Sequence, residues 1–241
     1  MIRMFLKMHN SIFKRKYFIT PALIIVFGFG LAINAQAALP AKNNFVLVVP
    51  FTAQAPLANW KDERQEDGCE EATSLMAMAW VKGEGIKAKE KISKAAWEKK
   101  IITLSDFEKN KYGEYRDVTL SDMVTWIFKD YFKYNKVSVQ PLISAHDILT
   151  ELEKGRLVLV PMNGQKLNNP NFTALGPTTH MLLIKGYDYK TKEFITNDPG
   201  TRQGENYRYL ENIIFKAIRV YPTGKHGKIK EIKKEMLVVE K

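Results

Sequence analysis

Cysteine is nearly absent from this sequence, since Cys69 is the one cysteine among 241 residues. A single cysteine excludes a disulfide within the chain. A lone thiol in an oxidising compartment is buried and inert, paired with another chain, or kept reactive. Composition alone favours a buried and inert cysteine, so the role of Cys69 has to be inferred from the residues around it.

Three functional motifs are also missing. No group of His, Cys and Asp residues has the spacing of metal ligands, so we expect neither a metal nor another cofactor. No motif with stacking aromatic residues predicts a nucleic-acid partner. The chain has no Gly-x-x-x-x-Gly-Lys-Ser/Thr loop for binding a nucleoside triphosphate. Apolar residues make up 45% of the chain and four are Trp, which predicts a folded core rather than disorder.

The N-terminus has the pattern of a signal peptide. Five basic residues precede an apolar run at 22–33, and Ala35-Gln36-Ala37 has the small-x-small pattern of a cleavage site. The run is shorter than the roughly 20 residues that span a bilayer. We therefore interpret 1–37 as a signal peptide cleaved after Ala37, with an uncleaved membrane anchor as the alternative. The protein is then expected to be exported, either secreted or held at the cell envelope.

The remainder is expected to form one domain at 38–222, followed by a basic tail at 223–241. About 204 residues are enough for one sizeable core. Without the five basic residues of the leader, the net charge of +11 falls to +6. That surplus fits an anionic envelope or membrane surface, and also an ordinary lysine-rich surface. Deletion of the tail is expected to leave the fold intact.

The order of the predicted elements indicates an α+β fold. After a short strand at 44–51, helical patterns occupy 69–82, 87–101 and 119–134. The second half is mostly extended, with strands at 136–141, 156–162, 180–188, 192–198 and 216–221 and helices at 144–155 and 209–215. Helices first and strands second predict a helical half packed on an antiparallel sheet.

Cys69 opens the helix predicted at 69–82. Asp67 is a good N-cap residue, and Glu70 completes a capping-box pattern three positions later. Free N–H groups and the helix dipole would then stabilise a thiolate, which is the nucleophilic form. Glu70 and Glu71 oppose this by repulsion, so a protonated histidine is needed to hold the thiol pKa low. The alternative is a small buried cysteine on an apolar helix face.

His180 is the histidine best placed to serve Cys69, because it opens an apolar strand after a loop. If the strands at 180–187 and 193–198 pair about Lys190, Asp198 lies diagonally across from His180. At that spacing, roughly 7–8 Å between Cα atoms, a carboxylate can orient an imidazole. Asp198 also belongs to an Asn-Asp-Pro-Gly turn, a compatible role. The other histidines lie in the leader, at a helix start and in the tail: His9, His146 and His226.

Three segments taken together resemble a known family. They are VPFTAQAPLANW…CEEATSLMAMAW, HMLLIKGYD and FITNDPGT, in this order along the chain. The combination resembles the C-39-like cysteine peptidases, which are relatives of the bacteriocin-processing double-glycine peptidases in the papain-like superfamily. The resemblance extends from about Val46 to Tyr221.

The resemblance implies a papain-like α+β fold and a set of site residues. Cys69 would be the nucleophile, His180 the general base and acid, Asp198 its orienting residue, and Gln54 the oxyanion donor. In the processing peptidases the glutamine lies only a few residues before the cysteine. Gln54 lies fifteen positions upstream and Gln65 four, so the oxyanion assignment is open between them.

The predicted function is that of an exported cysteine peptidase-like hydrolase that cleaves amide bonds in a peptide or protein. Exporter members of the family also carry a membrane domain and an ATPase. Because the phosphate-binding loop is missing, we expect no part in ATP-driven peptide export. Two alternatives stand beside this prediction. One is a cell-wall peptide amidase or hydrolase with the same triad, and the other is a non-catalytic papain-like binding module at the envelope.

Overall fold

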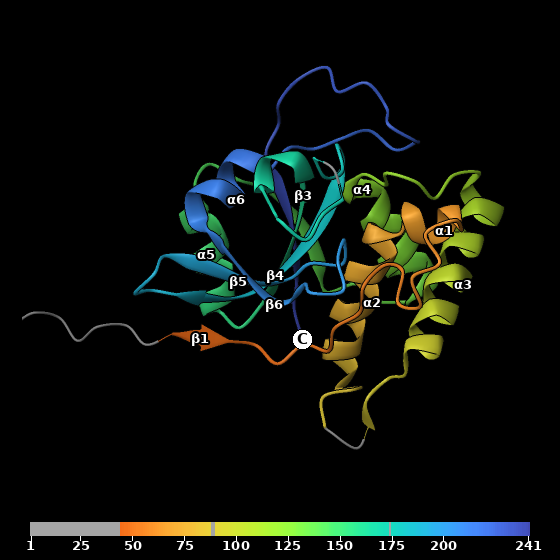
Figure 1. Cartoon of the computed structure of the whole chain (residues 1–241), viewed down its shortest axis with the longest axis horizontal. Helices are drawn as coiled ribbons and strands as arrows, with labels where there is room; N and C mark the ends of the chain where they lie inside the picture. The colour runs from red at the N-terminus through yellow and green to blue at the C-terminus, as the bar shows by residue number, and fades with distance from the viewer. Residues whose placement is uncertain (1–43, 88–89, 174) are drawn as a thin grey trace, which may run out of the picture. The chain divides into compact units, whose positions relative to one another are not determined.

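Most helices come in the first half of the chain and most strands in the second, as the order of predicted elements indicates (Figure 1). The computed structural model describes residues 44–87, 90–173 and 175–241. The predicted signal peptide at 1–37 lies outside the described residues. Within them, no helix is both long enough and apolar enough to cross a membrane.

The helical half comes first and is built around α2. Its elements are α1 (Glu63–Glu66), α2 (Cys69–Lys82), α3 (Lys94–Tyr112), α4 (Leu120–Asp122) and the π-helix η2 (Met123–Tyr131). The predicted bounds of α2 are confirmed, because its apolar run ends at Gly83 in the left-handed conformation. Helix α3 runs later than predicted, since Ser93 caps its first turn and Gly113 ends it.

The predicted N-cap of α2 is wrong. Gly68 occupies the N-cap position, and no side chain caps the helix. Asp67 is instead the C-cap residue of α1, which ends directly before α2 begins. A Cβ atom at Gly68 would lie 2.5 Å from the Arg64 carbonyl oxygen, so glycine is needed for this close succession of helices. Cys69 is nevertheless the first residue of α2, as predicted.

The strands of the second half, together with β1, form one antiparallel sheet of seven strands, which confirms the predicted α+β class. The strand order is β2-β7-β3-β4-β5-β6, and β1 pairs with β4. The strands are β1 (Phe45–Val46), β2 (Val137–Pro141), β3 (Leu157–Met162), β4 (His180–Asp188), β5 (Glu193–Asn197), β6 (Glu205–Leu210) and β7 (Glu235–Val239). The sheet half also contains α5 (Ala145–Glu153), the 3₁₀ helix η3 (Gly164–Leu167) and α6 (Glu211–Ala217).

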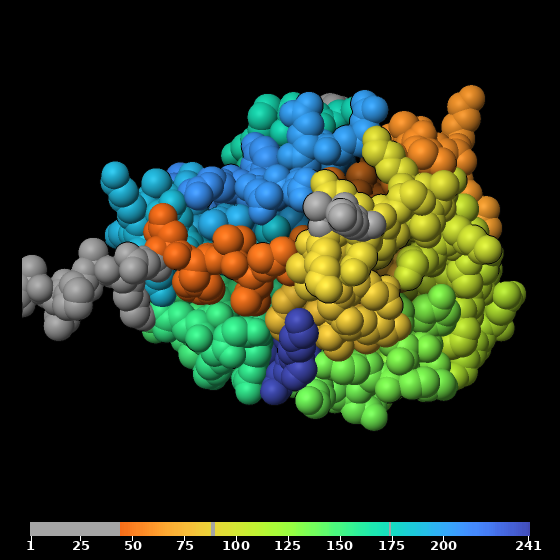
Figure 2. Space-filling view, turned by 90° about the horizontal axis from the view of Figure 1, so that it is seen from below, coloured from red at the N-terminus to blue at the C-terminus, as the bar shows by residue number. Residues whose placement is uncertain are grey.

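The prediction of a C-terminal tail at 223–241 is wrong for the residues of β7, because this strand lies inside the sheet between β2 and β3. Its residues pair with both neighbours, Val238 with Ser138 and with Val158. The chain end is also fixed, because the Glu240 N–H donates to the Lys136 carbonyl at 3.0 Å and Lys241 lies over the ring of Trp80. Figure 2 shows these last residues, in dark blue, on the surface beside the yellow residues of α2.

Two further strand predictions differ from the structure. The segment 216–221 pairs only through an isolated bridge between Met162 and Ile218, since α6 continues to Ala217. The sequence does not predict strand β6, because it is a polar edge strand and most of its residues are exposed.

Alternate residues of the central strands pack into two apolar cores. Met181 and Leu183 of β4 face the core shared with α2, while Leu182 and Ile184 face the core on the other side of the sheet. All nine residues of β4 are therefore buried. Burial on both faces explains why four consecutive residues of this strand, 181–184, are apolar. It also holds His180 firmly at the start of β4.

Candidate active site

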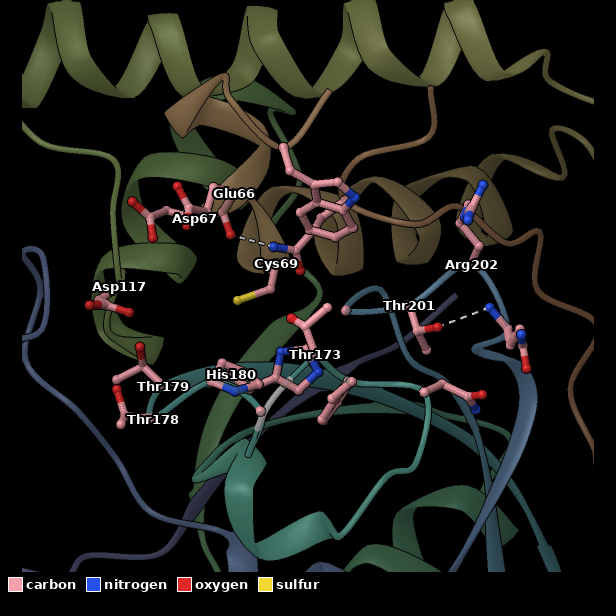
Figure 3. A pocket seen from close by; sticks show the side chains of 18 of the residues that line it. Glu66, Asp67, Cys69, Asp117, Thr173, Thr178, Thr179, His180, Thr201 and Arg202 are labelled. Atoms are coloured by element: carbon pink, nitrogen blue, oxygen red, sulfur yellow. Dashed lines mark hydrogen bonds between the residues drawn. The ribbon is translucent and has the colours of Figure 1, made fainter. Parts of the chain in front are cut away.

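A cleft of about 900 Å³ lies between the start of α2 and the start of β4. Cys69 and His180 both line it, one from each half of the chain, with Gln54 beside them. The loop after η3 and the turn after β5 complete its wall. Figure 3 shows the sulfur of Cys69 pointing from the helix end toward the side of the cleft that holds His180.

His180 and Asp198 form the contact predicted from the hairpin. The Nε2 atom of His180 lies 2.8 Å from Oδ1 of Asp198, and both side chains are buried. The register of β4 with β5 explains the contact: Leu183 pairs with Asn197, which brings Asp198 to the start of β4, where His180 lies. Because Nε2 faces a carboxylate, it carries a hydrogen, and Nδ1 is left as the acceptor nitrogen of a neutral ring.

Asp198 is held as a carboxylate. Burial alone would raise its pKa, but His180, the Tyr209 hydroxyl and the Gly200 N–H together keep the pKa of Asp198 below its ordinary value. The Tyr209 hydroxyl donates to Oδ2 at 2.5 Å, and the Gly200 N–H donates to Oδ1 at 3.0 Å. Asn169 also approaches Oδ2, at 3.4 Å. An ionised and oriented carboxylate fixes the orientation of the imidazole beside it.

Packing fixes the plane of the His180 ring. Phe172 meets it edge to face, with 5.5 Å between ring centroids. Gly200 lies close to both rings, because a Cβ atom there would be 2.9 Å from Cε1 of His180 and 3.0 Å from Cε1 of Phe172. The Asn-Asp-Pro-Gly turn therefore supplies both the carboxylate and the close backbone approach. Sequence reasoning missed Phe172, Tyr209 and Asn169, and no motif in the sequence marks them.

Of the two candidate oxyanion donors, the structure brings Gln54 to the cleft. Its Nε2 donates to the backbone carbonyl of Glu66, and its Oε1 is buried without a hydrogen-bond partner. The Gln54 N–H donates to the Pro199 carbonyl at 2.9 Å, which ties this loop to the turn of Asp198. Gln65 is fully buried and is not among the residues that line the cleft.

Comparison with known proteins identifies the family of the chain. Residues 46–224 match the family model of the peptidase C39-like family. The chain belongs to this family.

A solved structure from Bacillus anthracis, described as a candidate C39-like peptidase, is similar to this chain with a TM-score of 0.50. The two share 16% sequence identity, and the match covers 83% of this chain and 98% of that one. So low an identity shows a shared fold and no more. No curated protein matches the chain. Membership of the C39-like family supports a cysteine peptidase-like function in general terms.

In this C39-like family member, the position of Cys69 at a helix start does not lower the pKa of its thiol. Burial raises the pKa of Cys69 well above its ordinary value, and the neighbouring Glu70 raises it further. The backbone N–H of Met181 acts in the opposite direction but does not prevail. The thiol donates a hydrogen bond to Oε2 of Glu70 at 3.1 Å. Its proton therefore points to a carboxylate and not to His180.

A group of buried carboxyl residues lies behind the cleft in this family member. Glu70, Glu71 and Glu108 are each fully buried. Ser105 donates to Glu71 at 2.9 Å, and both carboxyl oxygens of Glu108 have no hydrogen-bond partner. Burial raises the pKa of Glu71 and Glu108 well above the ordinary value. The sequence predicts the repulsion from Glu70 and Glu71, but it does not predict their burial.

No metal site accompanies these groups. In the part of the chain that the structure describes, no cluster of three or more His, Cys, Asp or Glu residues is arranged to hold a metal ion.

Proposed function

We propose that this protein is an exported cysteine peptidase that hydrolyses amide bonds with Cys69, His180 and Asp198. The observation that carries the proposal is the buried His180–Asp198 pair at 2.8 Å, of which His180 lines the same cleft as Cys69. An oriented imidazole next to a thiol at a helix start is the arrangement that nucleophilic acyl transfer needs. Family membership adds support from an independent source.

The proposed reaction begins when Nδ1 of His180 takes the proton of Cys69. The thiolate attacks the carbonyl carbon of the substrate, and the resulting oxyanion receives hydrogen bonds from the Cys69 N–H and from Nε2 of Gln54. Gln54 must first give up its bond to the Glu66 carbonyl. His180 then protonates the leaving amine, which departs and leaves a thioester. Water hydrolyses the thioester, with His180 again acting as the base.

Asp198 serves the reaction through His180. Its carboxylate keeps the hydrogen on Nε2, so that Nδ1 is directed to the thiol. It also stabilises the imidazolium that forms when the proton is transferred. The Tyr209 and Gly200 donors keep Asp198 ionised while it does so.

Turnover assays with two substrates test this proposal. The full chain is incubated with unfolded protein and, separately, with peptidoglycan fragments, beside Cys69→Ala and Asp198→Asn. Cleavage of unfolded protein that Cys69→Ala abolishes and Asp198→Asn strongly reduces is the expected result. Cleavage of the cell-wall fragments alone would indicate a cell-wall amidase with the same triad. Melting temperatures of the variants within a few degrees of wild type would show that the loss is chemical.

One observation favours a second candidate, a non-catalytic binding module. The Cys69 thiol has a raised pKa and gives its hydrogen bond to Glu70, so the resting site holds no thiolate. A protein that binds unfolded peptide with unchanged affinity after Cys69→Ala, and cleaves neither substrate, would fit this candidate and not the peptidase.

Export and surface attachment are proposed from the sequence and its charge. The leader pattern at 1–37 predicts cleavage after Ala37, which N-terminal sequencing of the isolated protein tests directly. An intact Met1 would point to the membrane-anchor alternative. Five lysines occur in the segment between Tyr221 and β7: Lys225, Lys228, Lys230, Lys233 and Lys234. Lys225 and Lys233 pair with carboxylates and Lys234 donates to backbone carbonyls, whereas Lys228 and Lys230 are exposed and are the lysines proposed to meet an anionic envelope surface. Salt-dependent binding to anionic vesicles is the matching test.

A further inference from the structure

Glu70 is a fully buried carboxyl group next to the proposed nucleophile, and the proposed reaction gives it no role. Its two oxygens have different partners. Oε2 accepts the hydrogen bond from the Cys69 thiol at 3.1 Å, and Oε1 accepts one from the Tyr221 hydroxyl at 2.6 Å. The carboxyl group is therefore held in a single orientation, with one oxygen directed at the sulfur.

Tyr221 fixes Glu70 from a distant part of the chain. It lies 151 residues after Glu70, beyond α6, and its side chain is 2% exposed. Tyr221 also belongs to the same apolar core as Cys69. The position of the thiol proton is therefore set by the tertiary fold as well as by the first turn of α2.

The hydrogen bond to Glu70 competes with the proposed chemistry. The thiol has one proton, and while Glu70 accepts it, Nδ1 of His180 does not. An ionised carboxylate 3.1 Å from the sulfur also disfavours a thiolate by repulsion. His180 can take the proton readily only when this contact is broken or the charge on Glu70 is removed.

We propose that Glu70 is a positioning residue that holds Cys69 as a resting thiol and releases it toward His180 when the Glu70 carboxylate takes up a proton. The inference rests on the nucleophilic role of Cys69 in the proposed function. In the released state the proton of the sulfur passes to Nδ1 of His180, which gives a thiolate and an imidazolium. Glu70 stays neutral during this transfer.

The surroundings of Glu70 place its titration near neutral pH. Burial raises the pKa of Glu70 to about 7, with Asp117 adding to the rise, while the hydrogen bonds from Tyr221 and Cys69 act in the opposite direction. The titratable groups that face it come from α2, from α3, from the loop after α3 and from the segment after α6: Cys69, Glu71, Glu108, Asp117 and Tyr221. Release of the thiol is therefore expected as the pH falls through about 7.

Alkylation of Cys69 by iodoacetamide between pH 5 and 9 tests the inference on the full chain. Glu70→Gln removes the charge beside the sulfur and keeps an oxygen for Tyr221. We expect it to react at least tenfold faster than wild type at pH 8, since one pKa unit is a tenfold change in thiolate population. Glu71→Gln is the matched control, because Glu71 is equally buried in the same helical turn but contacts Ser105 instead of the thiol. It should keep the wild-type profile.

Tyr221→Phe provides an independent variant if Glu70→Gln does not fold. Loss of the hydroxyl donor raises the pKa of Glu70 further, so the gain in reactivity should begin at a higher pH than in wild type. A Glu70→Gln or Tyr221→Phe profile that coincides with wild type would overturn the inference. So would an equal acceleration in Glu71→Gln, because the effect would then not depend on contact with the sulfur.

His180→Ala separates this inference from the proposed function. If His180→Ala abolishes the reactivity below pH 7 while Glu70→Gln has no effect, the Cys69–His180 pair stands and the role of Glu70 is refuted. If labelling is indifferent to His180, the nucleophilic pair itself is refuted, and the role of Glu70 falls with it. Faster labelling in Glu70→Gln together with loss in His180→Ala supports both.

Discussion

Removal of β7 is expected to unfold the protein. A chain that ends at Lys234 lacks the four buried apolar residues Met236–Val239. At about 1.5–3 kcal/mol for each fully buried side chain, the loss amounts to roughly 6–12 kcal/mol. The whole free energy of unfolding of a domain is about 5–15 kcal/mol, so the truncated chain has little or no stability left. The deletion also leaves β2 and β3 without the strand between them.

Urea denaturation followed by far-ultraviolet circular dichroism measures this effect. The 1–234 chain is compared with the full chain, and a pair of point variants refines the result. Leu237→Ala, at a fully buried position of β7, is expected to cost about 2–5 kcal/mol. Ile232→Ala is the matched control, because Ile232 is 64% exposed, and it should change stability by less than about 0.5 kcal/mol. A 1–234 chain that unfolds cooperatively at the full-chain midpoint would refute the reasoning.

Three further predictions concern the site and the buried carboxyl groups. Glu108→Gln removes a carboxyl group whose pKa is raised in the folded protein, so that ionisation of this group destabilises the wild-type fold as the pH rises above about 4.5. By calorimetry, the variant should melt several degrees higher than wild type at pH 8 and at about the same temperature at pH 4. Tyr209→Phe removes a donor that lowers the pKa of Asp198, so the acid limb of the pH–activity profile should move to higher pH; an unmoved limb would contradict this. Gly200→Ala should displace His180 and lower kcat at least tenfold with little change in KM, because its Cβ would lie 2.9 Å from the ring; wild-type kinetics would show that the ring has room.

Local patterns in the sequence were enough to place the parts of the site. The bounds of α2 follow from an apolar helical run closed by Gly83. The contact of His180 with Asp198 follows from the register of one hairpin, in which the two strands are joined by a short turn. Both inferences need only residues that are near one another in the sequence, where turn and helix signals are strongest.

Long-range contacts account for what the sequence did not predict. Strand β7 is a run of four apolar residues after a lysine-rich segment, and its burial becomes evident only when β2 and β3 lie on either side of it. In the same way, the orientation of Glu70 depends on Tyr221, which lies 151 residues away. The raised pKa of the Cys69 thiol follows from its burial by both halves of the chain. The spacing of apolar residues within α2 does not reveal this burial.

The incorrect prediction of the helix cap bears on the mechanism. An Asp67 cap would have placed a carboxylate oxygen on an N–H group in the first turn of α2, where the proposed oxyanion must bind. With Gly68 at the N-cap, no side chain caps that turn. Glycine costs a helix only a few tenths of a kcal/mol relative to a capping side chain. The Cys69 N–H therefore has no side-chain cap, and the helix loses little stability. The acidic residues that oppose a thiolate, Glu70 and Glu71, follow Cys69 directly in the chain.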